Sequence, residues 1–372
     1  MDKVFKYELF NKMIRDFAVN EVKPLAHEVD EQERFPYETV EKMAKLGLMG
    51  IIVPKEYGGM GGDYKMYIKA VEELSKVCAT TGVILSAHTS LCIAPIMEYG
   101  NEEQKKKYLP KLASGEWLGA FGLTEPNAGT DANNQTTTAV KEGDHWVLNG
   151  SKIFITNAGP ANVYFVIAVT GRNPKGVECA AFIVEKGFPG FSVGKKELKM
   201  GIRGSSTCEL IFENCIVPEA NLVGKIGEGV KMALKTLDGG RVGISAQALG
   251  IAEGALEATV AYVKERKQFN KPISAFQNTQ FCLADLYTKI NAASLLVERA
   301  TEAKQNKSPM LGMYAAQAKL FAAETAMEVT TKCVQLHGGY VERMMRDAKI
   351  TEIYEGTSEV QRMVISGALL KK

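Results

Sequence analysis

Trp146-Val147-Leu148-Asn149-Gly150-Ser151-Lys152-Ile153-Phe154-Ile155-Thr156 is the segment that says most about the architecture of the chain. It contains two short runs rich in β-branched and aromatic residues, with an Asn-Gly pair between them, which is typical of a strand, a turn and a second strand. Similar runs follow at 164–169, 181–184 and 209–212, separated by Gly, Asn and Pro and not by helical patterns. Residues 119–226 are therefore predicted to form an antiparallel sheet or barrel.

Helical periodicity lies on both sides of this β zone. Before it, residues Phe10, Met13, Ile14, Phe17 and Ala18 recur at the spacing of one helix face. After it, apolar residues between 283 and 297 step by three and four, and helical stretches are predicted to end near 240, 270, 308 and 338. Long amphipathic helices joined by short loops indicate an antiparallel bundle. The order of helical, β and helical zones excludes a doubly wound nucleotide-binding fold.

The composition indicates an ordinary globular protein and excludes several classes of function. The 372 residues carry a net charge of +2, with acidic and basic residues interspersed, which argues against a nucleic-acid partner. The seven Cys and four His show neither C-x-x-C nor H-E-x-x-H spacing, so reduced thiols and no metal site are expected. Neither a signal peptide nor an apolar run of bilayer length is recognised, so we expect a cytoplasmic protein without membrane insertion.

Two segments have a composition suited to chemistry. Phe121–Asp131 combines small residues, two hydroxyls and a Pro-Asn turn, which suits either a backbone that approaches a planar ligand or a polar interdomain turn. Glu355 stands between Tyr354 and Gly356. It is either a desolvated carboxylate with a raised pKa, suited to act as a base, or a surface glutamate at a helix end.

These two segments, together with residues 146–157, 198–207, 236–255 and 335–339, resemble the acyl-CoA dehydrogenase family. The resemblance covers essentially the whole chain, and residues 201–207 and 237–241 are most similar to the short-chain, butyryl-CoA branch of anaerobic bacteria. It implies a mainly α protein with an N-terminal α-helical domain (1–118), a central antiparallel β-barrel domain (119–226) and a C-terminal four-helix bundle (227–372). It also implies FAD, a short-chain acyl-CoA substrate, an electron-transfer flavoprotein partner and a homotetramer.

The resemblance assigns roles to individual residues. Glu355 matches the catalytic base, which removes a proton from Cα of the thioester while FAD accepts a hydride from Cβ. Acyl-CoA contacts are implied for Thr130, Asp238, Arg241 and Gly356. FAD contacts are implied for Phe121, Leu123, Thr124, Phe154, Ile155, Thr156, Arg266, Phe269, Gln277, Gln335, Gly338, Gly339, Thr357 and Glu359. Among these, the Arg266 group is implied to hold the diphosphate, often across a subunit interface, and Gln335–Gly339 to reach the adenine side from a neighbouring subunit.

One stretch departs from the family pattern. After Gly339 the chain passes through Tyr340 directly into Val341, where relatives carry a loop longer by about seven residues, more than a usual loop adjustment. This puts the adenine-side FAD contact and part of the subunit interface in question. The alternatives within the fold are an enoyl-CoA reductase or a dehydrogenase for branched or aromatic acyl groups, because fold does not settle the reaction. A non-catalytic scaffold is the alternative of a different class.

Overall fold

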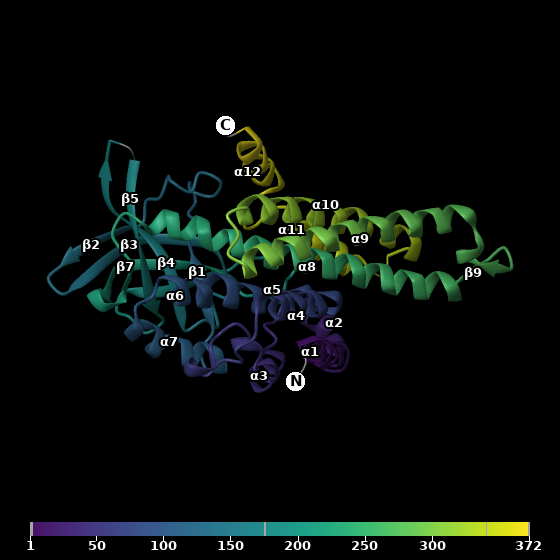
Figure 1. Cartoon of the computed structure of the whole chain (residues 1–372), viewed down its shortest axis with the longest axis horizontal. Coiled ribbons are helices and arrows are strands. Elements are labelled where there is room, and N and C mark those ends of the chain that lie inside the picture. Colours follow the sequence, from purple (N-terminus) through teal and green to yellow (C-terminus); the bar gives the residue numbers. More distant parts are fainter. Residues whose placement is uncertain (1–2, 175, 340, 371–372) are drawn as a thin grey trace.

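The computed structural model describes residues 3–174, 176–339 and 341–370. Figure 1 shows an elongated molecule, with a β-sheet at one end, long helices reaching to the other end, and the N-terminal helices packed along one side. The predicted succession of a helical, a β and a second helical region is confirmed. The domain boundaries at 118 and 226 stay a prediction.

The N-terminal helices are short and have defined starting signals. The side chain of Asp63 accepts the Met66 N–H (3.1 Å) at the start of α4, and Asn101 and Gln104 form a reciprocal capping box at α7. The predicted apolar face of the first helix is packed in the core, with Ile14 fully buried. The helices are α1 Lys3–Phe17, α2 Ala26–Glu31, α3 Tyr37–Lys45, α4 Tyr64–Val77, α5 Ala79–Ser86, α6 Ala94–Tyr99 and α7 Glu102–Ser114.

The segment Ala79–Tyr99 corrects one sequence expectation. Its 21 residues, which join α5 and α6 through the π-helical turn Ala87–Ile93, are long and apolar enough to cross a bilayer by length and composition. In this fold 89% of the apolar window is buried inside the protein, which is the position of a core helix. The expectation that no run approaches such a length was therefore wrong, because a helix surrounded by protein on all sides is apolar all round.

The central sheet is mostly antiparallel, and its hydrogen-bonded order is β6-β7-β3-β2-β4-β5-β8, with β1 beside β4. Two pairings differ from the prediction: β1 runs parallel to β4, and β2 meets β4 in a parallel contact. Within the described residues no pairing joins β6 to β8, so the sheet is not closed into a barrel by hydrogen bonds. The strands are β1 Gly119–Gly122, β2 Thr138–Glu142, β3 His145–Thr156, β4 Val163–Asn173, β5 Gly176–Glu185, β6 Phe191–Lys196, β7 Thr207–Pro218 and β8 Leu222–Val223.

Three long helices and two shorter ones form the C-terminal region. They are α8 Gly229–Glu265, α9 Gln277–Gln305, α10 Leu311–His337, α11 Glu342–Ile350 and α12 Ser358–Leu370, with the hairpin strands β9 Lys267–Gln268 and β10 Lys271–Pro272 between α8 and α9. The predicted helix end near Gly240 is wrong, since α8 continues through this residue. A glycine is required at this position for packing, because a side chain here would collide with Glu355.

Helix α11 ties the three regions of the chain together just before Glu355. Arg346 forms an ion pair with Asp30 of α2 (2.5 Å between Nη2 and Oδ2). The buried Asp347 accepts the backbone N–H of Ile202, in the segment between β6 and β7, at 2.6 Å. Because these contacts come from the N-terminal helices and from the sheet region, the turn that follows α11 is fixed by all three parts of the fold.

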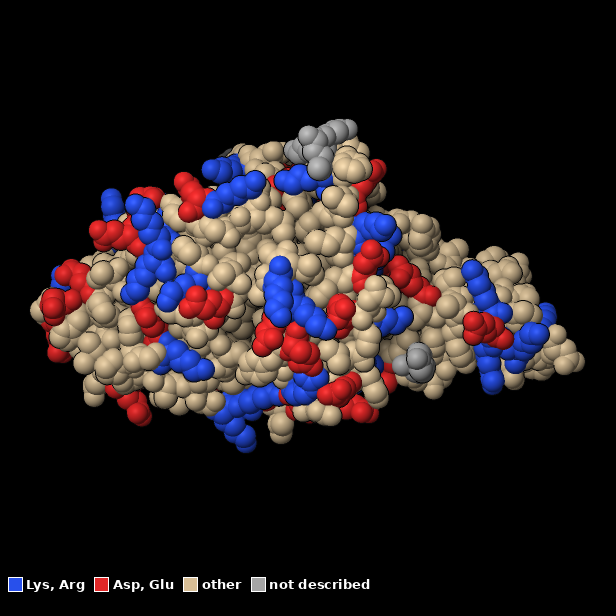
Figure 2. All heavy atoms as spheres, turned by 90° about the horizontal axis from the view of Figure 1, so that it is seen from below, with Lys and Arg blue, Asp and Glu red and all other residues tan. Residues whose placement is uncertain are grey.

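Charged side chains of both signs are interspersed over the face of the molecule that Figure 2 shows. The narrow end at the right of that view, where α8 and α9 meet, carries several basic side chains close together. Exposed residues there include Lys264, Arg266, Lys267 and Lys271.

Candidate active site

Glu355 stands in the turn between α11 and α12. Its φ is +52° and that of Gly356 is +95°, so two successive residues adopt the left-handed region that non-glycine residues avoid. Such backbone conformations cluster at functional sites. The Glu355 Oε2 atom is buried and has no hydrogen-bond partner within the described residues. This carboxylate oxygen therefore keeps an unused capacity to accept a hydrogen bond or a proton.

The surroundings of Glu355 tune its acidity. Burial raises the pKa of this carboxyl from 4.5 to about 7, and the neighbouring cations Lys319 and Arg241 act in the opposite direction. A carboxyl with a pKa near neutrality is ionised in a large fraction of molecules at neutral pH and still binds a proton well. These are the properties of a general base.

Helix α8 supplies the predicted substrate residues Asp238 and Arg241 beside Glu355. The buried Arg241 donates from Nη1 to Asp238 Oδ1 at 2.7 Å, and its Nε lies 3.5 Å from the Glu355 carbonyl oxygen. Burial raises the pKa of Asp238, and Arg241 opposes this effect. The structure therefore brings Asp238, Arg241 and Gly356 to the predicted base.

The residues predicted to line the flavin ring come from the end of β1 and from an irregular part of β3. The register of β3 against β7 shifts between Lys152 and Ile155, and Phe154 adopts a φ of +57° with 61% of its surface exposed. The Ile153 N–H donates to the Thr124 carbonyl at 2.8 Å, which joins the two segments. Bulges of this kind often lie next to active sites. This one presents an aromatic face and the half-buried Thr156, which fits a planar ligand.

Three of the predicted cofactor residues, Phe121, Leu123 and Ile155, are buried in the core. Phe121 is 9% exposed and stacks on Phe165 with ring centroids 6.2 Å apart, and Ile155 is 2% exposed. Any contact of these two residues with a ligand is therefore made by the backbone. Leu123 is also buried, whereas Thr124 is half-buried at the surface of the same segment.

A buried ion pair holds this segment in place. Lys152 Nζ donates to the carboxylate of Glu125 (2.6 Å), to Gln135 Oε1 (2.5 Å) and to the carbonyl of Leu123 (3.2 Å). Burial alone would raise the pKa of Glu125, but the Lys152 ammonium and hydrogen bonds from Thr136 hold it at about 2. The loop that carries the predicted substrate residue Thr130 begins at Glu125 and ends at Gln135 and Thr136. Both of its ends are thus bonded to the ion pair, through Lys152–Gln135 and Thr136–Glu125.

Two groups of predicted FAD residues lie far from Phe154. Arg266, the 87% exposed Phe269 and Gln277 occupy the hairpin and helix start at the tip of α8 and α9, at the opposite end of the molecule from β1 and β3 in Figure 1. Gln335, Gly338 and Gly339 end α10, where the adjacent His337 stacks on Tyr262 of the distal half of α8. One copy of the chain does not bring these residues to Phe154. The shortened stretch after Gly339 includes Tyr340, which lies outside the described residues.

Thr357 and Glu359 lie just beyond the predicted base. They border a small cavity of about 180 Å³ at the start of α12, which Glu324, Lys349 and Glu352 also line. Thr357 Oγ1 accepts the Val360 N–H (3.3 Å), so it also helps to start the helix. Their predicted contact with FAD stays a prediction.

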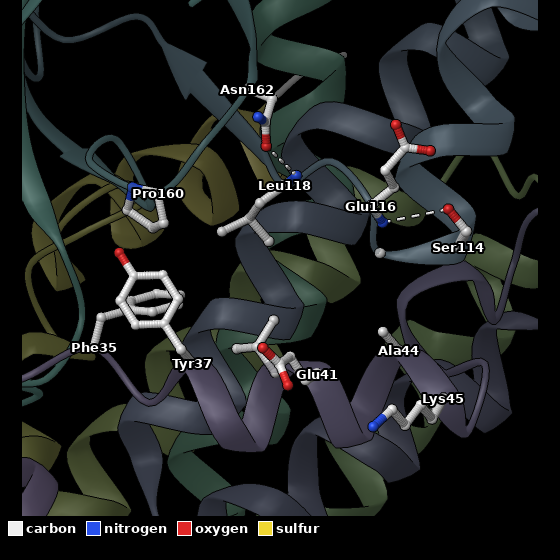
Figure 3. Close-up of a pocket in the computed structure, with 12 residues that line it drawn as sticks. Phe35, Tyr37, Glu41, Ala44, Lys45, Ser114, Glu116, Leu118, Pro160 and Asn162 are labelled. Carbon is white, nitrogen blue, oxygen red and sulfur yellow. Dashed lines mark hydrogen bonds between the residues drawn. The ribbon is translucent and has the colours of Figure 1, made fainter.

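A larger cavity, of about 520 Å³, lies away from these residues (Figure 3). It is bordered by α3, by the connection from α7 to β1 and by the loop before β4, with Tyr37, Glu41 and Pro160 around it. None of the predicted site residues lines it. Within the described ranges, no group of three or more His, Cys, Asp or Glu side chains is placed to hold a metal ion.

Sequence reasoning missed the two buried lysines of the site. Lys319 of α10 is fully buried, and its Nζ donates to the Gly356 carbonyl at 2.7 Å. Lys152 is fully buried in β3. The sequence spacing could have indicated that both lysines are buried. Lys319 follows the helical spacing of the core alanines of α10, and Lys152 follows the alternation of Trp146 and Leu148 in β3.

Comparison with known proteins gives matches over nearly the whole chain. Three family models match: the acyl-CoA dehydrogenase N-terminal domain at residues 6–116, the middle domain at 120–215 and the C-terminal domain at 227–370. A short-chain specific acyl-CoA dehydrogenase of Clostridium acetobutylicum is 60% identical over 371 residues, which cover 98% of this chain and 98% of that protein.

Solved structures agree with the sequence matches. Butyryl-CoA dehydrogenase from Megasphaera elsdenii is 50% identical with a TM-score of 0.95, covering 98% of each chain. A chain from work on the electron transferring flavoprotein of Acidaminococcus fermentans and flavin-based electron bifurcation is 53% identical, with the same TM-score and coverage. An acyl-CoA dehydrogenase from Bacillus anthracis complexed with FAD is 36% identical with a TM-score of 0.93, covering 98% of this chain and 66% of that one.

Proposed function

The chain belongs to the acyl-CoA dehydrogenase family, and from this premise we propose that it catalyses the FAD-dependent α,β-dehydrogenation of a short-chain acyl-CoA. The reaction is butyryl-CoA to crotonyl-CoA, or its reversal, with electron exchange through an electron-transfer flavoprotein. The observation that carries this proposal is Glu355, whose buried and unbonded Oε2 and raised pKa of about 7 suit it to remove the α-proton.

The backbone of the same residue has a second role in this proposal. Among the described residues, the Glu355 N–H makes no hydrogen bond to another group of the chain. It is therefore free to donate to the thioester oxygen, where negative charge accumulates as the α-proton leaves. A fixed donor at such an oxygen typically contributes a few kcal/mol to the stabilisation of the transition state.

The segment around Phe154 is proposed to hold the flavin ring, with Thr124 and Thr156 as hydroxyl donors beside it. The exposed aromatic ring at a strand bulge supports this assignment, because it offers a flat apolar surface next to backbone groups that the sheet leaves free. When FAD is bound, it supplies the acceptor for the hydride that leaves Cβ. The residues of this chain orient the thioester and move the proton.

The short acyl chain and the partner are inferred from the relatives. The Clostridium relative is named as short-chain specific, and the Megasphaera structure is a butyryl-CoA dehydrogenase. The match to a chain from work on an electron transferring flavoprotein supports such a protein as the redox partner. The base with its buried, unbonded oxygen, set beside Asp238 and Arg241, argues against a non-catalytic scaffold.

We also propose a homotetramer in which each FAD contacts two subunits. Arg266, Phe269 and Gln277 lie at the far end of the chain from Phe154, so a second copy is needed to bring them to the same flavin. Exposed apolar side chains on the outer helices offer a surface for such a copy, with Phe281 and Leu295 on α9 and Met363 on α12. Closed symmetry is the usual result of self-association.

We also propose that the protein is located in the cytoplasm. All seven cysteines are free, which suits a reducing compartment, and the relatives named above are bacterial.

The test is the visible spectrum of the purified protein before and after anaerobic addition of butyryl-CoA. A yellow protein whose flavin absorbance bleaches on addition supports dehydrogenation. A panel that includes longer, branched and aromatic acyl-CoA esters, each assayed with and without an electron-transfer flavoprotein, then ranks the substrates. A colourless protein, or a flavin that butyryl-CoA leaves oxidised, would contradict the proposal.

A further inference from the structure

Lys319 has an environment that lysine side chains seldom occupy. It projects from α10 and is fully buried, at a position where its neighbours on the same helix face are alanines such as Ala315, Ala322 and Ala326. Burial of an ammonium group costs free energy unless the charge is paired or hydrogen-bonded. Burial also lowers the pKa of Lys319 to about 8, so the side chain remains mostly charged at neutral pH. The fold therefore retains a costly charge at this place.

The contacts of this ammonium all lie at the turn that carries the proposed base. Lys319 Nζ donates to the Gly356 carbonyl at 2.7 Å. Gln361 Nε2 of α12 donates to the same oxygen at 2.7 Å, so the carbonyl is held from two helices. Glu355 and Gly356 both have positive φ, a conformation that persists only where its surroundings over-determine it. Together with Arg241 of α8 at the Glu355 carbonyl, these two donors hold the turn against the helices of the C-terminal region.

Two cations lie near Glu355, and they differ in how far their charge is already compensated. On α8, Arg241 is bonded to Asp238, so much of its charge is already compensated. Of the two neighbouring cations, Lys319 has the larger lowering effect on the pKa of Glu355. Tyr67 of α4 and Tyr354 also face the site, but burial raises the pKa of both hydroxyls and keeps them neutral. Glu352 and Glu359 are anions that act on Lys319 itself.

We propose that Lys319 is a positioning residue for the reaction: its ammonium holds the Glu355–Gly356 turn in the left-handed conformation and provides the positive charge that keeps the Glu355 carboxylate ionised. This inference rests on the proposed function, in which Glu355 is the base. Lys319 acts through Glu355 and does not itself touch the reacting atoms. Its donor function and its charge are separable by substitution.

Three variants of the holoenzyme distinguish the hydrogen-bond donor function of Lys319 from its positive charge. Lys319→Met removes donor and charge, Lys319→Gln keeps a shorter donor without charge, and Lys319→Arg keeps both. Lys332→Met is the matched control, because Lys332 is exposed on the same helix. The measurement is the rate of anaerobic flavin reduction by saturating butyryl-CoA as a function of pH. Bleaching of the parent protein tests the proposed function separately from the role of Lys319.

Loss of the cation raises the pKa of Glu355, so the acid limb of the pH profile is expected to move upward by about one unit in the Met and Gln variants and to stay in place in Arg and in the control. The plateau rate of Lys319→Met is expected to fall by about 100-fold, because a misplaced base loses its geometry. A merely structural lysine would lower the rate at every pH without moving the limb.

A second readout does not depend on turnover. The infrared band of the protonated carboxyl, assigned by its loss in Glu355→Gln, reports the titration of Glu355 directly in each variant. An upward shift in Lys319→Met and Lys319→Gln supports the proposal. A parent-like titration in both variants, with plateau rates within about twofold of the parent, would overturn it.

Discussion

Gly240 lies directly against the carboxylate of Glu355: a Cβ atom on Gly240 would stand 2.0 Å from Glu355 Oε2. Helix α8 is intact on both sides of this glycine, so the residue does not serve to end or bend the helix. Its missing side chain makes the space in which the proposed base rests. A side chain at position 240 would therefore displace the carboxylate of Glu355.

Gly240→Ala is expected to displace the Glu355 carboxylate and to lower the rate of flavin reduction by about 100-fold, because small misplacements of a catalytic group are costly. Folding should be retained, since alanine favours helices over glycine. Gly367→Ala is the control, because a Cβ atom added at Gly367 of α12 would meet no atom within 4 Å. Stopped-flow reduction by butyryl-CoA measures the effect, and a parent-like rate in Gly240→Ala would show that the carboxylate works from another position.

Glu355→Gln keeps the size of the side chain and removes its basicity. We expect a yellow, folded protein that binds acyl-CoA and reduces its flavin 10²–10⁴-fold more slowly, the usual contribution of a positioned base. Glu56→Gln, at an exposed residue of the N-terminal region, is the matched control. Near-normal bleaching by butyryl-CoA in Glu355→Gln would rule out Glu355 as the base.

The raised pKa of Glu355 also predicts an effect on stability. Burial favours the neutral carboxyl in the folded state, with a pKa of about 7 against 4.5 for the exposed group. The folded protein therefore loses stability as the pH rises from about 4.5 to about 7, and the full loss persists above that range. Glu355→Gln is expected to melt at a higher temperature than the parent at pH 8, with little difference at pH 4. Scanning calorimetry of the holoprotein at both values checks the sign, and an equal or lower Tm at pH 8 would contradict it.

Arg266→Ala is expected to weaken FAD retention and to lower the Tm, because a ligand bound only by the folded state stabilises that state. Lys264→Ala at the same tip is the control for charge.

If two subunits share each flavin, FAD release should also depend on protein concentration, and the short connection after Gly339 should increase the release of FAD. Flavin fluorescence during dilution, together with sedimentation, measures both. A monomer that keeps FAD at high dilution would refute the shared site.

Lys152→Met is expected to leave the carboxylate of Glu125 buried without its partner, which typically costs 3–5 kcal/mol. The loop between Leu123 and Thr136 should loosen, and FAD retention should fall with it. The double variant Lys152→Met/Glu125→Gln should recover part of the stability, because it removes the unpaired charge. Lys141→Met, in an exposed ion pair of β2, is the control. Thermal melts that show no recovery in the double variant would mean that the pair does not act as a unit.

The sequence was sufficient for the order of the regions and for several strands, since the short apolar runs at 164–169, 181–184 and 209–212 lie in β4, β5 and β7. The Asn149-Gly150 pair was wrongly interpreted as a turn: β3 passes through it as a single strand, and the pair instead marks a shift in the register of β3 against β7. The parallel pairing of β1 with β4 was not predictable, since it joins segments about 40 residues apart by a connection that no local pattern encodes.

Two kinds of site residue were beyond a local interpretation. The sequence around Gly240 predicts a helix end, because nothing near it in the chain shows that Glu355 packs there. The separation of Arg266 from Phe154 is likewise a property of the folded chain, and only the length of α8 and α9 reveals it. Lys319 and Lys152 stood in core-facing positions of their periodic patterns, but a lysine there is ordinarily assumed to reach solvent.

The anchoring of α11 has a consequence for the integrity of the molecule. Arg346 reaches Asp30 and Asp347 reaches Ile202, so the turn that holds Glu355 takes its place only when helices from the beginning of the chain, the sheet and the last helices have docked. A truncated or half-assembled chain would lack these contacts, so the geometry of the Glu355 turn depends on all three regions. Activity that depends on Glu355 therefore requires the whole chain to be folded.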